Sequence, residues 1–353
     1  MINFALIGCG RIAKRHSELL GFNQIKDARL SAVCDLKEDL ASNIGKKFSV
    51  PFYQDMHEMI KNEPIDVIVI LAESGLHAKI ALDLMCYGKH IVVEKPMALT
   101  LEDADKMILE ANKAGIKLFV IKQNRFNLPV KKLKEALDSG RLGKINLGTV
   151  RVRWCRNQDY YDQAKWRGTW KLDGGVLSNQ ASHHIDLLEW MLGEPESVYA
   201  KAKTAFVDIE AEDTALVIIK FRNGALGIIE ATTAVRPKDL EGSISILGEK
   251  GSVVIEGFAV NKLKTWDFVN ELPTDKNVLE DFSENPPNVY GYGHKAYYDH
   301  IVECINLNKP QLVDGLEGRK SLELINAIYE SIETGREVFL RYKPLKCKLG
   351  YEN

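Results

Sequence analysis

A glycine-rich turn between two apolar runs, within the first forty residues, constrains the fold of this chain more than any other feature. The apolar residues 4–7 lead directly into Gly8-Cys9-Gly10-Arg11-Ile12-Ala13, and a second apolar run ends at Asp35. Gly8 permits a tight turn after a strand, Gly10 lets a phosphate approach the backbone, and Ala13 lets the next helix pack on the sheet. The segment therefore predicts a β-α-β unit that binds a dinucleotide.

The residues after the turn and after the second run predict which dinucleotide binds. Arg11 and Ile12 open the helix, whose free N–H groups are available to phosphates. A carboxylate at Asp35 accepts hydrogen bonds from the ribose hydroxyls and repels a 2′-phosphate, so it favours NAD over NADP. The nearby Lys37 weakens that preference. We expect NAD as the cofactor.

The composition of the chain narrows its class. A length of 353 residues predicts two domains, and a formal net charge of -2 offers no general attraction to nucleic acid or to an anionic membrane. The N-terminus lacks a signal sequence, and no apolar stretch approaches the roughly twenty residues of a membrane span. We expect a cytoplasmic protein.

The cysteines and histidines give no sign of a metal or of disulfides. The six cysteines form no C-x-x-C pair, which is typical of a chain with reduced thiols. No group of residues has metal-ligand spacing, and the adjacent His183 and His184 would point to different sides of a helix. We therefore predict that no metal is bound.

The alternation of apolar runs predicts an α/β fold with two domains. Residues 1–122 alternate strands, near 4–7, 30–34, 67–71, 90–93 and 118–121, with amphipathic helices, as in a Rossmann domain. Residues 123–353 form the predicted substrate-binding and oligomerisation domain, which we expect to be α+β.

The second domain is predicted to contain a large, open, mostly antiparallel sheet with helices on one side. Its expected helices cover 130–138, 177–192, about 294–308 and 316–334, its strands lie near 144–154, 197–206, 214–221, 225–234, 243–247 and 252–256, and 262–293 is expected to be irregular. An open sheet must bury its second face, so a homo-oligomer, either a dimer or a tetramer, is expected.

Glu94-Lys95-Pro96 follows a strand at the sheet edge where a nicotinamide would lie. An ammonium group hydrogen-bonded to a sugar hydroxyl lowers the cost of forming an alkoxide as hydride leaves the same carbon. Lys95 is therefore a candidate catalytic residue. The alternative is a surface lysine before a turn.

A glycine turn at residues 173–175 leads into a second candidate element. Asn179, His183 and Asp186 fall at i, i+4 and i+7, which places them on one face of the predicted helix. His183 can accept a proton near neutral pH, and Asp186 would orient or support it. A histidine in such a helix is otherwise a satisfied core residue, but the upstream nicotinamide motif favours catalysis.

Residues 151–170 are dense in cations and rings. They include Arg151, Arg153, Trp154, Arg156, Tyr160, Tyr161, Lys165, Trp166, Arg167 and Trp170. Guanidinium groups bind carboxylates and phosphates, and the rings pack against sugar or nicotinamide faces. Stacking on single-stranded nucleic acid is the alternative, which the acidic balance of the chain disfavours.

With these motifs in this order, the whole chain resembles the Gfo/Idh/MocA family of two-domain NAD(P) sugar dehydrogenases. The family more often has aspartate where Asn179 stands, so the resemblance implies no acidic role for this residue. Within the family, the chain is similar to dehydrogenases of UDP-linked N-acetylglucosaminuronates from O-antigen synthesis. The matching segments are 160–183, Lys122-Gln123-Asn124-Arg125, 240–251 and Val289-Tyr290-Gly291-Tyr292-Gly293-His294.

The resemblance implies oxidation of the sugar 3″-hydroxyl to a ketone by NAD. His183 would take the hydroxyl proton and Lys95 would stabilise the alkoxide, although the two can exchange roles. The implied cofactor residues are Gly8, Gly10, Arg11, Ile12, Asp35, Ser74, His77, Glu94, Lys95, Gln123, Trp166 and Arg167. The implied substrate residues are Lys95, Asn124, Arg156, Tyr160, Asn179, His183 and His294.

Two other functions stay open at this stage. The same reaction on UDP-N-acetylglucosamine or another sugar or sugar phosphate would need no arginine for a C6 carboxylate. A regulatory NAD-binding protein without catalysis is the second alternative, and the presence of both Lys95 and His183 argues against it.

Overall fold

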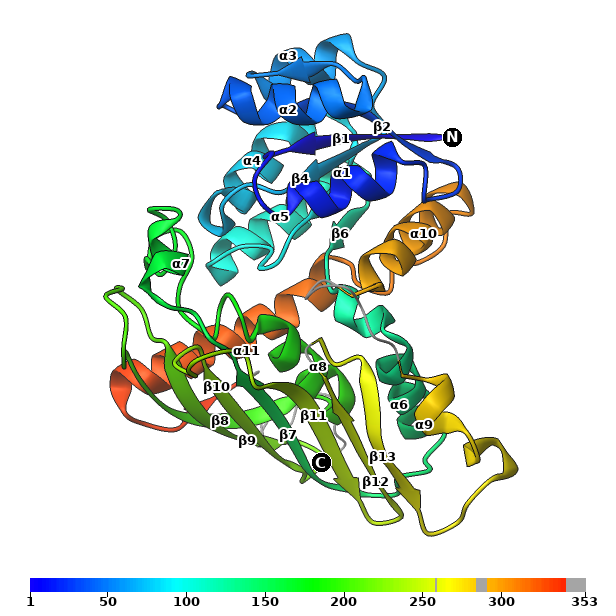
Figure 1. Cartoon of the computed structure of the whole chain (residues 1–353), viewed down its shortest axis with the longest axis vertical. Coiled ribbons are helices and arrows are strands. Elements are labelled where there is room, and N and C mark those ends of the chain that lie inside the picture. The colour runs from blue at the N-terminus through cyan, green and yellow to red at the C-terminus, as the bar shows by residue number, and fades with distance from the viewer. Residues whose placement is uncertain (258, 284–290, 341–353) are drawn as a thin grey trace, which may run out of the picture.

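The computed structural model describes residues 1–257, 259–283 and 291–340, and it contains two α/β parts, each built on its own sheet (Figure 1). Val289 and Tyr290 of the motif noted above, and Cys347, lie outside the described residues. No helix in the described part of the chain is long and apolar enough to cross a membrane.

The N-terminal sheet has six parallel strands in the order β3-β2-β1-β4-β5-β6. Helices pack against it, which is why strands such as β4 are buried along their whole length. The predicted Rossmann fold is confirmed. The strands are β1 (Ile2–Ile7), β2 (Ala28–Cys34), β3 (Phe52–Tyr53), β4 (Val67–Ile70), β5 (His90–Val93) and β6 (Leu118–Val120). The helices are α1 (Ala13–Gly21), α2 (Glu38–Phe48), α3 (Met56–Asn62), η1 (Ser74–Leu76), α4 (His77–Leu84), η2 (Met85–Tyr87) and α5 (Leu101–Lys113).

The C-terminal sheet has eight strands in the order β13-β12-β11-β7-β10-β9-β8-β14. Only β7 and β10 are parallel neighbours, so the predicted large, mostly antiparallel sheet is confirmed. Its strands are β7 (Ile145–Arg153), β8 (Pro195–Lys203), β9 (Thr214–Phe221), β10 (Leu226–Thr232), β11 (Glu241–Gly248), β12 (Gly251–Glu256), β13 (Lys262–Phe268) and β14 (Val338–Phe339). The helices of this half are η3 (Gln123–Phe126), α6 (Leu128–Asp138), α7 (Gln158–Asp162), α8 (Ser182–Leu192), η4 (Pro273–Asp275), α9 (Val278–Asp281), α10 (Gly293–Asn306) and α11 (Gly315–Thr334).

Helices α8 and α11 cover one face of this sheet (Figure 1). Gly148 of β7 lets α8 approach closely, because a Cβ there would lie 2.7 Å from the side chain of Leu192 and 2.9 Å from that of Leu188. The helix is thereby held at a fixed height above the sheet, with His183 in its first turn.

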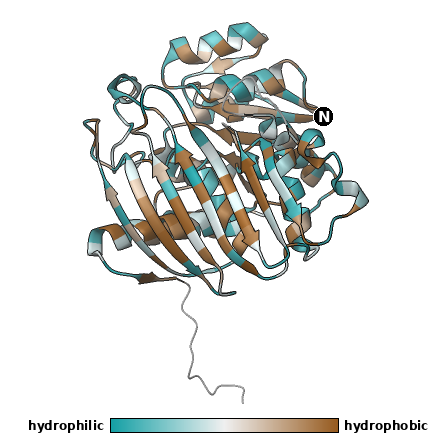
Figure 2. Ribbon diagram, turned by 60° about the horizontal axis from the view of Figure 1, so that its bottom comes forward, coloured by the Kyte–Doolittle hydropathy of each residue, from teal (hydrophilic) through white to brown (hydrophobic). Residues whose placement is uncertain are grey.

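The opposite face of the sheet is open and carries apolar side chains. Leu216 and Ile218 of β9 are each 59% exposed, and Leu226 and Ile228 of β10 are 49% and 39% exposed. Figure 2 shows these strands side by side, with hydrophobic residues along several of them. The face therefore has the character of a surface that another chain covers.

The structure corrects two of the predicted elements. Residues 262–268, expected to be irregular, form β13 against β12. The helix expected over 177–192 begins only at Ser182. Gly174 has φ +83°. The hydroxyl of Ser178 donates to the main-chain carbonyl of Asp173, and the N–H of Leu177 donates to the carboxylate of Glu212. These bonds replace those of a helical turn.

Helix α10 follows the C-terminal sheet in sequence but packs on the N-terminal domain. Tyr297, Tyr298 and Ile301 belong to the hydrophobic core of that domain, and the Tyr297 hydroxyl donates to the carbonyl of Val120 at 2.7 Å. The chain therefore returns to the first domain before it forms α11.

Candidate active site

The glycine turn after β1 has the shape that a dinucleotide requires. Gly8 has φ +92°, and a Cβ on it would lie 2.8 Å from the backbone nitrogen of Ala72. A Cβ on Gly10 would meet no heavy atom within 4 Å, which leaves open space beside the backbone there. Arg11 is exposed and Ile12 half-buried at the start of α1. The residues present therefore fit the pyrophosphate of NAD.

Asp35 is fixed beside this turn. Its carboxylate accepts one hydrogen bond from the N–H of Cys9 at 2.7 Å and another from the N–H of Lys37 at 2.9 Å. Both donors are main-chain groups, so the carboxylate is oriented before a ribose arrives. Lys37 itself is exposed at the start of α2.

Ser74 and His77, predicted to contact the adenosine, lie after β4. Both are buried. The ring nitrogens of His77 face the carbonyl oxygens of Pro96 at 2.7 Å and Ala72 at 3.0 Å. His77 thus joins the ends of two neighbouring strands, and its contact with the cofactor stays a prediction.

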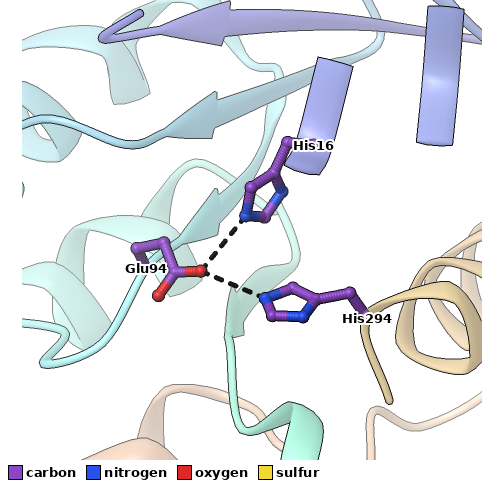
Figure 3. A group of neighbouring side chains, drawn as sticks. All are labelled: His16, Glu94 and His294. Atoms are coloured by element: carbon purple, nitrogen blue, oxygen red, sulfur yellow. Dashed lines mark hydrogen bonds and ion pairs between the residues drawn. The ribbon is translucent and has the colours of Figure 1, made fainter. Parts of the chain in front are cut away.

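Glu94 lies between two buried histidines that are far away in sequence (Figure 3). Its Oε1 atom is 3.1 Å from Nε2 of His16 on α1 and 3.6 Å from Nε2 of His294 on α10. Its Oε2 atom accepts the N–H of Lys95 at 2.9 Å, and Nδ1 of His16 lies 2.7 Å from the hydroxyl of Tyr298. Burial alone would raise the pKa of Glu94, but the hydrogen bonds from the two histidines outweigh it and lower the pKa well below its usual value.

The sequence does not predict this cluster of His16, Glu94 and His294, because no sequence signal distinguishes His16 from a core residue of α1. His16, Glu94 and His294 have donor atoms within 4.8 Å of one another, as a metal site would require. Hydrogen bonds and an ion pair already join these atoms, so the arrangement needs no metal to satisfy them. His294, predicted to touch substrate, is 1% exposed and is held by the cluster.

Lys95 and His183, the predicted catalytic pair, both stand at the carboxyl edge of the N-terminal sheet. The Lys95–Pro96 peptide bond is cis, and the ammonium of Lys95 donates to the main-chain carbonyl of Asn179 at 2.8 Å. The Nε2 atom of His183 lies 3.1 Å from the amide nitrogen of Gln123. Since that amide nitrogen only donates, His183 accepts at Nε2 and is neutral.

Burial and charge support the neutral state of His183. Burial, followed by the positive charges of Lys95 and Lys122, holds the pKa of His183 well below its usual value. Burial also lowers the pKa of Lys95, and the neighbouring carboxylates Glu94 and Asp173 oppose this effect. A neutral imidazole thus stands ready to accept a proton, with a cation close by.

Asp186 makes no hydrogen bond to His183 among the described residues, which corrects the predicted orienting role, but its negative charge acts to raise the pKa of His183, so a supporting role remains. Its carboxylate accepts hydrogen bonds from Nε and Nη2 of Arg125, each at 2.8 Å, and lies 3.5 Å from Nζ of Lys122. Burial alone would raise the pKa of Asp186, but Arg125 and Lys122 lower it to about 2. Asn179 lies in the turn before α8, so these residues do not share one helical face.

The predicted cation and ring segment forms a stack beside the site. The guanidinium of Arg167 lies 4.5 Å from the ring centre of Tyr160 and 4.8 Å from that of Trp166. Its Nη1 donates to the Tyr160 hydroxyl at 2.6 Å, and its buried Nε has no hydrogen-bond partner among the described residues. Arg156 stacks on Trp154 and donates from Nη1 to Asp239 at 2.9 Å.

The remaining predicted substrate residues lie near the pair. Asn124 is buried beside Gln123 in η3, and Asn179 is half-buried. The sequence placed Lys122 only in a matching segment, without a role. Two basic residues that follow an apolar strand, Lys122 and Arg125, are a signal for a buried charge network. The roles of all these residues toward ligands stay predictions.

A parallel sheet whose strand order reverses between β1 and β4, with an open glycine turn and a fixed carboxylate at that point, defines an NAD-binding oxidoreductase. The family comparisons agree. Residues 2–122 match the oxidoreductase family model of the NAD-binding Rossmann fold, and residues 134–340 match that of the C-terminal alpha/beta domain. The chain belongs to the Gfo/Idh/MocA family of oxidoreductases, and its cofactor is NAD.

Individual relatives differ in what they act on. The WlbA dehydrogenase from Bordetella pertussis, solved in complex with NADH and UDP-GlcNAcA, is 40% identical with a TM-score of 0.92, over 97% of this chain and 98% of that one. A WlbA dehydrogenase from Chromobacterium violaceum, solved with the same ligands, is 41% identical with a TM-score of 0.90, over 98% and 97%. The myo-inositol 2-dehydrogenase of Thermotoga maritima is 30% identical over 96% of this chain and 98% of its own length.

Proposed function

We propose that this protein oxidises the 3-hydroxyl of UDP-N-acetylglucosaminuronic acid to the 3-keto sugar. The step would belong to the synthesis of a diaminouronic acid for O-antigen. In the balanced reaction, the alcohol loses a hydride from C3 and a proton from oxygen, and NAD becomes NADH.

The described residues support a division of labour. His183 is neutral and accepts the hydroxyl proton at Nε2, where it now accepts from Gln123. The ammonium of Lys95 stabilises the oxygen as negative charge develops on it. NAD, when bound, supplies the carbon that accepts the hydride. The glycine turn holds the pyrophosphate and Asp35 holds the ribose.

The observation that carries this substrate is similarity over the full length. Identity to the two WlbA dehydrogenases is 40% and 41%, against 30% to the inositol enzyme. The stacked Arg167 and the nearby Arg156 also give the protein guanidinium groups for an anionic ligand.

A cyclitol such as myo-inositol is the second candidate, because two of the relatives that match along nearly the whole chain are inositol dehydrogenases. An inositol carries no carboxylate and no pyrophosphate. The two candidates therefore differ in their need for arginine.

Parallel assays separate the candidates. The protein is mixed with NAD and one of UDP-N-acetylglucosaminuronate, UDP-N-acetylglucosamine or myo-inositol, and reduced-nicotinamide absorbance and product mass are followed. We expect a loss of two mass units from the uronate at a kcat/KM at least about tenfold above the others, the effect of one charge-assisted contact. Turnover of inositol alone would overturn the proposal. Tight NAD binding with no turnover of any compound would favour the regulatory alternative.

The arginine that reads the C6 carboxylate is tested with the same assay. Arg156→Ala should raise KM for the uronate and leave the kinetics of UDP-N-acetylglucosamine unchanged. An equal effect on both sugars would mean that Arg156 only supports Trp154 and Tyr160.

A further inference from the structure

Asp173 is a buried acidic residue to which the proposed chemistry gives no role. It lies at the start of the glycine turn that precedes α8, and its exposed fraction is 1%. A buried carboxylate is costly unless it is hydrogen-bonded, so its partners indicate what it does.

The carboxylate of Asp173 joins the two segments that flank the site. Its Oδ2 accepts the N–H of Gly168 at 2.8 Å, at the end of the Tyr160–Arg167 stack. Its Oδ1 accepts the side-chain amide of Asn179. The main-chain carbonyl of Asn179 in turn accepts the ammonium of Lys95. A continuous chain of hydrogen bonds therefore runs from Asp173 through Asn179 to Lys95.

Buried side chains and main-chain hydrogen bonds hold the apolar part of this turn, as the N–H of Leu177 donates to the carboxylate of Glu212 at 2.9 Å. A cavity of about 440 Å³ borders it on the side of α11 and is lined by Asp173, Gly174, Ser178 and Tyr329, among others. The main chain of Asn179 bonds to Gly175 and Ser182, and its side-chain amide bonds to Asp173. Asp173 therefore contributes the side-chain restraint on the position of Asn179.

We propose that Asp173 is a positioning residue of the active site, which holds the carbonyl of Asn179 where it binds the Lys95 ammonium and keeps that lysine charged. This proposal rests on the proposed function in one respect only, because the measurement of kcat in its test needs the proposed substrate. The titration of Lys95 itself is independent of the substrate.

The charges around both groups fix the direction of the expected effect. Burial lowers the pKa of Lys95, the charges of Glu94 and Asp173 raise it, and Lys122 and Arg167 lower it further. The neighbour His183 is neutral and adds no charge. Around Asp173, burial raises the pKa, whereas Lys95 and Arg167 lower it. Glu212, the other buried acid of the turn, has a pKa raised by burial to about 7.

The test is the variant Asp173→Asn, which keeps the size of the side chain and removes its charge. The exposed Asp162→Asn in the preceding segment is the matched control. The pKa of Lys95 is measured in the NAD-bound protein by reductive methylation with formaldehyde at a series of pH values, with peptide mass spectrometry. NAD affinity, measured by calorimetry, reports whether each variant is folded.

In Asp173→Asn we expect the pKa of Lys95 to fall by about one pH unit, since a nearby negative charge is lost. The high-pH limb of kcat should move down by the same amount, with kcat lower by about tenfold at its maximum. Asp162→Asn should match the wild type in all three.

An unchanged Lys95 titration in a variant that still binds NAD would overturn the proposal, whatever the substrate is. If Asp173→Asn does not fold, Asn179→Ala replaces it. Loss of the amide should then lower kcat and lower the pKa of Lys95 by less than Asp173→Asn does, because the carbonyl is no longer held but Asp173 keeps its charge. Unchanged kcat in Asn179→Ala would overturn the proposal as well. Absence of turnover in the wild type alone would instead contradict the proposed function.

Discussion

At the scale of single residues, the site depends on the charged side chains that surround the neutral imidazole of His183. Lys95 and Lys122 are two cations that act on His183, and each is matched by a buried carboxylate, Glu94 or Asp186. The imidazole therefore stays unprotonated near neutral pH. The sequence predicted the pair Lys95 and His183, but not the second lysine that acts on both.

Replacing Lys122 should move both limbs of the pH profile in the same direction. Lys122 lowers the pKa of His183 and that of Lys95, so Lys122→Met should raise both. The low-pH limb of kcat, where His183 gains a proton, and the high-pH limb, where Lys95 loses one, should each shift up by about half a pH unit. The exposed Lys131→Met serves as control. Limbs that move apart would contradict this assignment of charges.

Metal removal tests the reading of the Glu94 cluster. Because hydrogen bonds and an ion pair already join His16, Glu94 and His294, we expect the protein to work without a metal. Treatment with EDTA followed by gel filtration should change kcat by less than about twofold, a difference too small to reflect a lost catalytic ion. Activity lost on chelation and restored by Zn²⁺ would show that the cluster binds a metal.

At the scale of elements, the regular parts were predictable and the turns were not. Five of the six strands of the N-terminal sheet follow from apolar runs that two covered faces require, whereas the short, partly exposed edge strand β3 was not predicted. Helices α10 and α11 follow from their helical periodicity. The late start of α8 at Ser182 does not, because Asp173, Ser178 and Glu212 capture groups that a helix would otherwise use. Side-chain competition of this kind depends on residues that are distant in sequence.

The same limit explains the wrong role predicted for Asp186. Helical spacing correctly placed it one turn after His183, but the short helix η3 brings Arg125 to its carboxylate. Helical spacing describes the residues of one element only. The role of a buried charge such as Asp186 depends on its partner, which here lies on another element.

Removing the charge of Asp186 should destabilise the fold. Asp186→Asn leaves Arg125 buried without its full partner, and we expect a loss of about 3 kcal/mol in the free energy of unfolding at pH 7. The exposed pair of Asp105 with Arg319 is the matched control, and Asp105→Asn should change it by less than about 1 kcal/mol. Urea unfolding measures both, and equal effects would contradict the account.

The pH dependence of this contribution has a definite sign. The pKa of Asp186 is about 2 in the folded protein, below its value of about 4 in an unfolded chain. The stabilisation is therefore present above about pH 4 and is lost as the pH falls toward 2. The difference between wild type and Asp186→Asn should shrink over that range.

At the scale of the whole molecule, the two faces of the C-terminal sheet differ in what covers them. One face of its sheet is covered by α8 and α11, and the other carries exposed Leu216, Ile218, Leu226 and Ile228. Several charged groups on that face form ion pairs within the chain, as Arg153 does with Glu230 at 2.6 Å, which reduces the repulsion that a second copy would meet. We propose that two copies pair through this face.

The pairing is tested by replacing two apolar side chains of this face with glutamate. The double variant Leu216→Glu and Ile218→Glu should convert the oligomer to a monomer in light scattering after gel filtration, because buried unpaired carboxylates oppose association. Leu109→Glu, at an exposed leucine of α5, should leave the mass unchanged. An oligomer that survives the double variant would mean that another surface carries the contact.

In the proposed reaction, hydride leaves C3 of the uronate sugar, and an isotope label at this carbon follows it. UDP-N-acetylglucosaminuronate with deuterium at C3 is incubated with the protein and NAD, and the nicotinamide product is analysed by mass spectrometry. We predict NADH that carries one deuterium and a keto sugar that has lost it. NADH without deuterium, formed from the labelled sugar, would contradict oxidation at C3.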